Sequence, residues 1–183
     1  MSRYVILGAV IFILVLMYNS LVSKKNQVEN IFGSIDALLK KRRNLIPNLV
    51  ESVKAYMTHE KDVLEDITSL RSRAEKAADE NERMDIENRI SSLLGRILVN
   101  VENYPELKAN ENVMHLQMTL AEIEEQISAA RRAYNQAVTD YNNAIEMIPT
   151  NILAKLMGYK RKSVYTISGE ERENVDVGKM FRK

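Results

Sequence analysis

The chain has 183 residues, of which 26 are basic and 25 acidic, so its formal net charge is only +1. This balance gives no reason to expect nucleic acid or an acidic substrate as the partner. The absence of cysteine excludes a disulfide scaffold, a thiolate metal site and a catalytic thiol. Six glycines and three prolines are few for a protein with many turns, which favours long helices over many strands.

An uncharged apolar stretch, YVILGAVIFILVLMYNSLVS, runs from Tyr4 to Ser23. As a helix it would rise about 30 Å, which matches the hydrocarbon thickness of a bilayer. A cleaved signal peptide is the alternative, but the stretch ends without a small-residue cleavage site of the alanine type. The sequence therefore predicts a single transmembrane anchor over residues 1–23, with membrane-facing or interfacial side chains at Tyr4, Leu7, Ile11, Leu14 and Tyr18.

The charges that flank this anchor bear on its orientation. Arg3 lies on one side, whereas Lys24, Lys25, Lys40 and Lys41 follow on the other. Because Lys and Arg are enriched in cytoplasmic segments close to a span, the sequence favours a domain on the cytoplasmic side.

Apolar side chains recur at helical spacing almost throughout residues 24–158. One stripe covers residues 28–49, and a three- and four-residue alternation covers residues 46–77, with Glu60 in a core position. Residues 78–81 then break the pattern with polar, cap-forming side chains. The first part of the chain thus predicts long helices separated by a short turn.

The second part of the chain shows clear helix ends. A helix ends at Tyr104, because Pro105 prevents its continuation. Asn110 is a suitable N-cap for a helix whose heptad pattern continues over residues 113–148 without a slip, and Pro149 ends that helix. From residue 159 onward the chain is polar and poorly periodic, which predicts a loosely structured tail over 159–183.

Pro47 interrupts the apolar stripe of RRNLIPNLVESVKAY, residues 42–56. A proline inside a helix removes one backbone hydrogen bond and crowds the preceding turn. The sequence therefore predicts a first long helix that is kinked or split near Pro47, with Asn48 and Asn135 as candidates to satisfy the freed backbone groups. The predicted fold is all-α: an N-terminal transmembrane helix followed by an antiparallel bundle of long helices over residues 24–158.

Five segments closely resemble those of the LemA family of bacterial membrane proteins. They are YNSLVSKKNQV, RRNLIPNLVESVKAYMTHE, YPELKANENVMHLQMTLAEIEEQI, AARRAYNQAVTDYN and MIPTNILAKLMGY. The resemblance implies a single-span protein of the bacterial cytoplasmic membrane with a four-helix up-and-down bundle. It implies no general biochemical activity. Because genes of the family lie beside those of membrane metalloproteases, such a protease is one partner that the resemblance suggests.

Glu60 is a candidate site residue because a carboxylate in a core position must be paired or have its pKa raised. Arg131 and Tyr134, on or next to the seam of the long helix, are the candidate partners. The functional interpretation is a polar switch or proton site, and the structural one is a buried pair that fixes helix register. The structural interpretation is favoured.

Two further polar groups are candidates for structure or interaction. Arg42 and Arg43, in the run KKRR, are expected to cap and to pair with acidic neighbours such as Glu51, with binding of a partner or of lipid headgroups as the alternative. The pairs Tyr134-Asn135 and Tyr141-Asn142 share a helix face. Interhelical hydrogen bonds are expected there, with a ligand-binding ladder as the alternative.

The sequence offers no residues for catalysis or for a cofactor. His59-Glu60 and Glu111…His115 lack the Glu-x-x-His spacing of a di-iron bundle, and neither a phosphate-binding loop nor a nucleophile elbow is present. We therefore expect no enzyme, no metal, no cofactor and no small-molecule substrate. The favoured function is a membrane-anchored scaffold that binds another membrane protein or itself. The alternative is a self-assembling protein that organises or remodels membranes.

Overall fold

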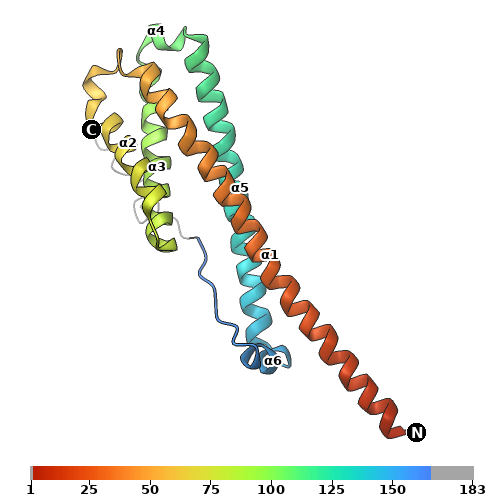
Figure 1. Ribbon diagram of the computed structural model, residues 1–183. Coiled ribbons are helices and arrows are strands. Elements are labelled where there is room, and N and C mark those ends of the chain that lie inside the picture. Colours follow the sequence, from red (N-terminus) through yellow and green to blue (C-terminus); the bar gives the residue numbers. More distant parts are fainter. Residues whose placement is uncertain (1, 166–183) are drawn as a thin grey trace, which may run out of the picture. The chain divides into compact units, whose positions relative to one another are not determined.

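The computed structural model describes residues 2–165, except for the side chains at positions 80 and 81. Every regular element in this range is a helix, which confirms the all-α prediction (Figure 1). In chain order the elements are α1 (Ser2–Val53), the 3-10 turn η1 (Thr58–Glu60), α2 (Lys61–Lys76), α3 (Glu80–Val101), α4 (Pro105–Lys108), α5 (Glu111–Glu146) and α6 (Thr150–Leu156).

Helix α1 begins in the apolar stretch and is the one helix among residues 2–165 that is long and apolar enough to cross a membrane. Its most apolar window of 18 residues has a mean hydropathy of 2.6 and is only 6% buried. This agrees with the predicted N-terminal transmembrane helix. The predicted anchor side chains are all exposed, namely Tyr4, Leu7, Ile11, Leu14 and Tyr18.

At Pro47 the structure has one continuous helix rather than two, because α1 runs on to Val53. The proline side chain is exposed and does not lie in the apolar face. Ile46, Leu49 and Val53 are completely buried around it. Core packing on both sides of the proline thus holds together a helix that loses a single backbone hydrogen bond.

The described chain forms two compact units, and α1 and α5 each contribute to both. Unit 1 contains the residues up to Leu38 together with Glu125–Tyr165, and unit 2 contains Leu39–Glu124. No unit begins at residue 24, since α1 continues from the apolar stretch into the bundle without a break. The domain boundaries expected at residues 23 and 158 stay predictions.

Unit 2 is built from the end of α1, α2, α3 and the first part of α5, which alternate in direction (Figure 1). Two side chains cap its helices as their sequence predicts. Asp79 accepts a hydrogen bond from the Glu82 amide (2.8 Å) at the start of α3, and Asn110 accepts one from the Val113 amide (3.3 Å) at the start of α5. Its core consists of Ile46, Leu49, Val53, Met57, Leu64, Ile67, Leu70, Ala74, Ile86, Ile90, Leu94, Ile97, Val101, Leu107, Val113 and Leu120.

The pattern over residues 46–77 does not correspond to one helix. Residues 54–57 form a turn between α1 and η1. The alternation over residues 46–77 would place Tyr56 in the core, but Tyr56 is 40% exposed and Met57 is buried in its place at 1% exposure. The turn changes the register, so Glu60 lies partly exposed in η1 rather than at a core position.

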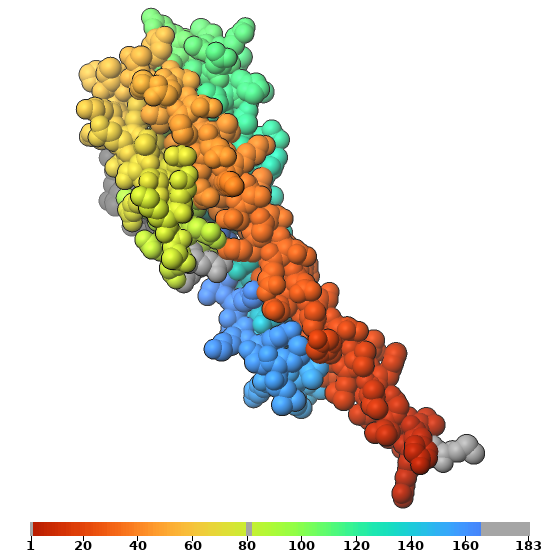
Figure 2. Space-filling model, in the orientation of Figure 1, coloured from red at the N-terminus to blue at the C-terminus, as the bar shows by residue number. Residues whose placement is uncertain are grey.

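Unit 1 pairs the first part of α1 with the second part of α5 in antiparallel directions (Figure 1). Ile127, Tyr134, Ala137 and Tyr141 are buried as the heptad pattern predicts, whereas Ile148 at the end of the pattern is 82% exposed and lies beyond α5. Beyond α5, the residues around α6 lie against α1 (Figure 2).

The segment after α6 corrects part of the predicted tail. Gly158 has φ +67°, which glycine adopts without strain. The Tyr159 amide donates to the Ala154 carbonyl (3.0 Å) and the Gly158 amide to the Lys155 carbonyl (3.1 Å), the pattern of a Schellman motif. Residues 159–165 then run along α5 and are held there by hydrogen bonds, so loose packing does not describe them. The rest of the predicted tail, 166–183, lies outside the described residues.

Candidate functional site

A buried network of charges crosses unit 2 between α1, α3 and α5. Arg42 is completely buried and so is Glu87. One terminal nitrogen of Arg42 donates to the Ser91 hydroxyl and to the Glu124 carboxylate, each at 2.5 Å. The other donates to the Glu87 carbonyl (3.0 Å) and carboxylate, and Arg43 binds the second oxygen of that carboxylate. Two cations and two anions therefore neutralise each other inside the bundle.

This network corrects the predicted partner of the arginines. The arginines pair with acidic side chains, as expected, but Glu51 is not one of them. Glu51 is exposed and pairs with Lys54 (2.6 Å) instead. Arg42 and Arg43 are both buried, which leaves Lys40 and Lys41 as the exposed part of KKRR. A surface patch of four charges is therefore not formed.

The sequence contained a signal for Glu124 that the interpretation missed. Glu124 stands four residues after Leu120 and three before Ile127, both buried, so it lies on the inner face of α5. Glu87 follows the buried Ile86 directly, and nothing local distinguishes it from a surface carboxylate.

The carbonyl that Pro47 leaves without its helical donor belongs to Arg43, four residues earlier. The Nε of Arg71, on α2, donates to this oxygen at 3.0 Å. Asn48 and Asn135 do not have the predicted role. The Asn48 side chain is exposed, and Asn135 bonds to Tyr165 in unit 1. The proline thus exposes an acceptor through which a second helix binds α1.

Glu60 has a partner that the sequence did not predict. Its carboxylate accepts a hydrogen bond from the Tyr104 hydroxyl at 2.8 Å, whereas Arg131 and Tyr134 belong to unit 1. This hydrogen bond raises the pKa of Tyr104, and burial and the charge of Glu60 act in the same direction. The bond contributes to stability below the ordinary tyrosine pKa of 10.0 and is lost as pH rises through the raised value. Tyr104 directly precedes Pro105, which begins α4.

The two Tyr-Asn pairs of α5 form a ladder, but with an extended segment rather than with another helix. The Asn135 amide donates to the Tyr165 carbonyl (2.9 Å) and accepts from the Tyr165 amide (2.7 Å). Asn142 makes the same two bonds with Lys162, at 2.9 and 3.0 Å. Each asparagine therefore supplies the donor and acceptor that a neighbouring β-strand would supply.

The tyrosines of the ladder add one bond each to the same segment. The Tyr134 hydroxyl donates to the Ser163 carbonyl (3.4 Å), and the Tyr141 hydroxyl donates to the Lys160 carbonyl (3.1 Å). Burial raises the pKa of Tyr141, with further contributions from Tyr159 and Glu29, which keeps the hydroxyl neutral as a donor. The ladder is thus occupied by the chain itself.

Arg131 also faces this segment. Its guanidinium lies 5.2 Å from the centre of the Tyr165 ring, close enough for a cation–π interaction. Tyr134 packs edge-on against the same ring, with the ring centres 5.4 Å apart. Arg131 and Tyr134 therefore help to hold residue 165 in place and are not the partners of Glu60.

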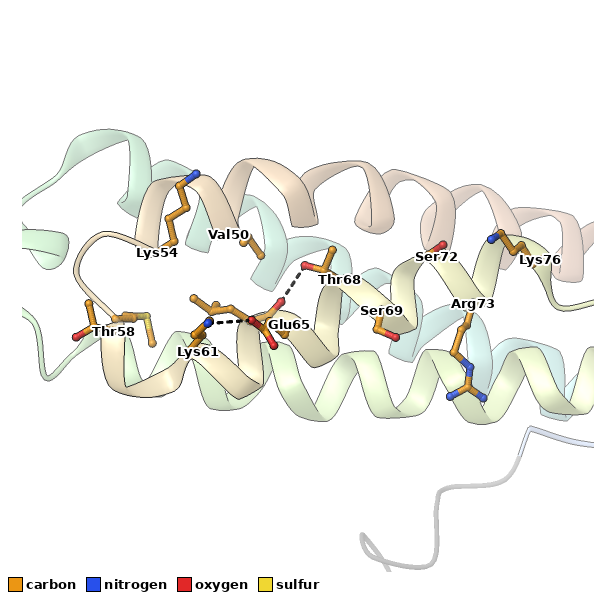
Figure 3. A pocket seen from close by; sticks show the side chains of 12 residues that line it. Val50, Lys54, Thr58, Lys61, Glu65, Thr68, Ser69, Ser72, Arg73 and Lys76 are labelled. Atoms are coloured by element: carbon orange, nitrogen blue, oxygen red, sulfur yellow. Dashed lines mark hydrogen bonds and ion pairs between the residues drawn. The ribbon is translucent and has the colours of Figure 1, made fainter.

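A groove of about 860 Å³ lies between the end of α1 and α2 in unit 2 (Figure 3). Val50, Met57 and Leu64 supply its apolar lining. Lys54, Thr58 and Lys61 gather at one end and Ser72, Arg73 and Lys76 at the other (Figure 3). The one acidic lining residue, Glu65, is 3.5 Å from Lys61. The groove therefore combines an apolar interior with an excess of positive charge at the end formed by Arg73 and Lys76, whereas the lysines at the other end are paired with carboxylates.

No group of three or more His, Cys, Asp or Glu side chains within the described residues is placed to hold a metal ion. His59 lies in η1, on the exposed side of unit 2.

One family model and several curated proteins match the chain. The model of the LemA family matches residues 31–178. Over 175 residues the chain is 27% identical to Protein LemA of Metamycoplasma hominis, covering 95% of this chain and 80% of that protein. It is 24% identical to Magnetosome protein MamQ 2 of Paramagnetospirillum magneticum, over 87% of this chain and 69% of that protein. Magnetosome protein MamQ of Magnetospirillum gryphiswaldense is 23% identical, over 85% and 68%.

Proposed function

Because the chain belongs to the LemA family, we propose that it is a membrane-anchored helical scaffold that binds another membrane protein through the groove between α1 and α2. The groove is the observation that carries this proposal. Its apolar interior and its basic end at Arg73 and Lys76 suit an amphipathic segment that carries acidic side chains. A membrane metalloprotease, which the family resemblance suggests, is the candidate partner.

The anchor gives this groove its functional advantage. A domain tethered to a bilayer searches a thin layer rather than the volume of the compartment, which raises its effective concentration for other membrane proteins. A modest affinity of the groove is then sufficient for stable association. The rigid helices on both sides of the groove keep its shape, so little ordering is required when a partner binds.

Site-specific photocross-linking in cells tests the proposal. A photoreactive amino acid at Ser69, which lines the groove and is exposed, should yield an adduct with a membrane protein other than this chain. The matched control is the same substitution at the exposed Ser92 of α3, outside the groove, where we expect no adduct.

Charge reversal identifies the chemistry of the contact. Lys54→Glu, Arg73→Glu and Lys76→Glu together should abolish the Ser69 adduct. Reversal of three exposed basic residues outside the groove, Arg89, Arg96 and Lys108, should preserve it. An adduct of twice the 21.0 kDa mass of the chain would instead support the alternative of self-assembly, and equal cross-linking at Ser69 and Ser92 would refute the groove as the binding surface.

A further inference from the structure

An apolar surface in unit 1 lies beside the transmembrane stretch. Met147 and Ile148, in the turn after α5, are 63% and 82% exposed. Ile152 and Leu156, on α6, are 63% and 81% exposed. So much exposed apolar surface within ten residues is of the kind that marks an interaction site.

The neighbours of this surface indicate what covers it. A cavity of about 300 Å³ separates α6 from α1, and all of its lining residues are apolar: Val10, Ile13, Leu14 and Met17 from α1, and Pro149, Ile152, Leu153 and Leu156 from the region of α6. Figure 2 shows the surface around residue 150 lying against the N-terminal helix. The α1 residues belong to the uncharged stretch 4–23. Whatever hydrocarbon surrounds that stretch therefore also reaches α6.

The length of the exposed apolar run of α1 also indicates that hydrocarbon reaches α6. Its large apolar side chains are exposed from Tyr4 to Tyr18, whereas Leu21 is completely buried. The exposed run rises only about 21 Å, less than the hydrocarbon thickness of about 30 Å. Hydrocarbon of that thickness extends beyond the exposed run in at least one direction. The α6 region lies against Val10–Met17, inside the exposed run, and is therefore at the depth of the hydrocarbon.

Apart from Lys155, charged side chains begin where this apolar surface ends. Lys24 and Lys25 follow the stretch in α1, and Lys160, Arg161 and Lys162 follow Gly158. Two carboxylates are paired with them: Glu146 with Arg161 (2.6 Å), and Glu29 with Lys162 (3.7 Å) and Lys25 (3.7 Å). The remaining excess of positive charge suits the anionic headgroups of a bilayer.

We propose that Met147–Leu156 inserts into the leaflet next to the bundle as a second, non-spanning membrane element packed on α1, with a lipid acyl chain in the cavity between them. Lys155, exposed on α6, extends its stem along the apolar surface and its ammonium group to the headgroups. Two membrane contacts instead of one fix the tilt and rotation of unit 1 on the bilayer. This surface lies in the other unit from the groove, so it is independent of the proposed partner binding.

Tryptophan fluorescence tests this insertion directly, because the chain has no native tryptophan. Ile152→Trp is introduced into the full chain, which is reconstituted into phosphatidylcholine–phosphatidylglycerol vesicles with acyl chains brominated at defined depths. We expect blue-shifted emission and a loss of at least about half of the fluorescence, as for Phe12→Trp in the span. Leu156→Trp should behave in the same way, which separates insertion from a local effect of one substitution.

The negative control is Val99→Trp in unit 2, where the valine side chain is 68% exposed. We expect red-shifted emission and no quenching by brominated lipid for this variant. The proposal would be overturned if both α6 variants showed the same red emission and the same lack of quenching as Val99→Trp. So would quenching of Phe12→Trp alone, because it would show a single membrane element.

Discussion

Arg42 carries a full positive charge at a position with no exposed surface. Taking such a charge out of water costs several kcal/mol per ion, and it is tolerated because Glu87, Glu124 and Ser91 surround the guanidinium. From α1, the planar guanidinium can donate hydrogen bonds to α3 and α5 at the same time, which a lysine ammonium cannot do in the same geometry. The network therefore selects one register for α1, α3 and α5, since a shift of any helix would leave a buried charge without its partner.

Arg42→Met should destabilise the full chain by about 3–5 kcal/mol, because the buried Glu87 then has one cationic partner instead of two and Glu124 keeps only its hydrogen bond from Ser91. Urea unfolding in detergent micelles, followed by circular dichroism, measures the change. The control is Arg89→Met on the exposed side of α3, which should stay within about 0.5 kcal/mol of the unsubstituted chain. Equal effects of the two substitutions would show that the network contributes nothing specific.

At the scale of a helix, Pro47 and Arg71 act as a pair. Arg71→Met should cost about 1–3 kcal/mol, because the half-buried Arg43 carbonyl then has neither its helical donor nor the guanidinium. In a Pro47→Ala background the restored amide at position 47 can donate to that carbonyl, so the same substitution should cost less. The loss of the Arg71–Glu75 ion pair (3.1 Å) is common to both backgrounds and cancels in the cycle. Equal costs in the two backgrounds would contradict the coupling.

The extended segment after α6 is attached to α5 chiefly by side chains, and this makes it separable from the helices. Asn142→Ala should remove the hydrogen bond of the Lys162 amide and raise its exchange rate with solvent, measured by hydrogen exchange with NMR or mass spectrometry. Asn143→Ala changes the adjacent, exposed residue and should leave that rate unchanged. Unaltered protection of Lys162 in Asn142→Ala would show that the ladder does not hold the segment.

Considered as a whole, the molecule was predictable from its sequence where the deciding interactions are local. Asn110 and Pro105 set helix ends through their own backbone and side-chain chemistry, and heptad spacing identified the buried face of α5. The turn at residues 54–57 contains no glycine or proline that would reveal it. The apolar spacing therefore continues across the turn and predicts a core position for Glu60, which is wrong. The partners of Arg42, Asn135 and Asn142 are distant in sequence, and no spacing rule could select Glu87, Tyr165 or Lys162.

Orientation across the membrane is the property on which the search for a partner depends. The excess of Lys24, Lys25, Lys40 and Lys41 over Arg3 leads us to expect the bundle in the cytoplasm. The chain has no cysteine, so Ser2→Cys and Ala109→Cys, both at exposed positions, report separately to a membrane-impermeant maleimide in intact cells. Labelling at position 2 alone supports a cytoplasmic groove, whose partners are cytoplasmic segments of membrane proteins. Labelling at position 109 alone would contradict the charge argument, and the acidic segment that fits the groove would then belong to a protein of the cell envelope.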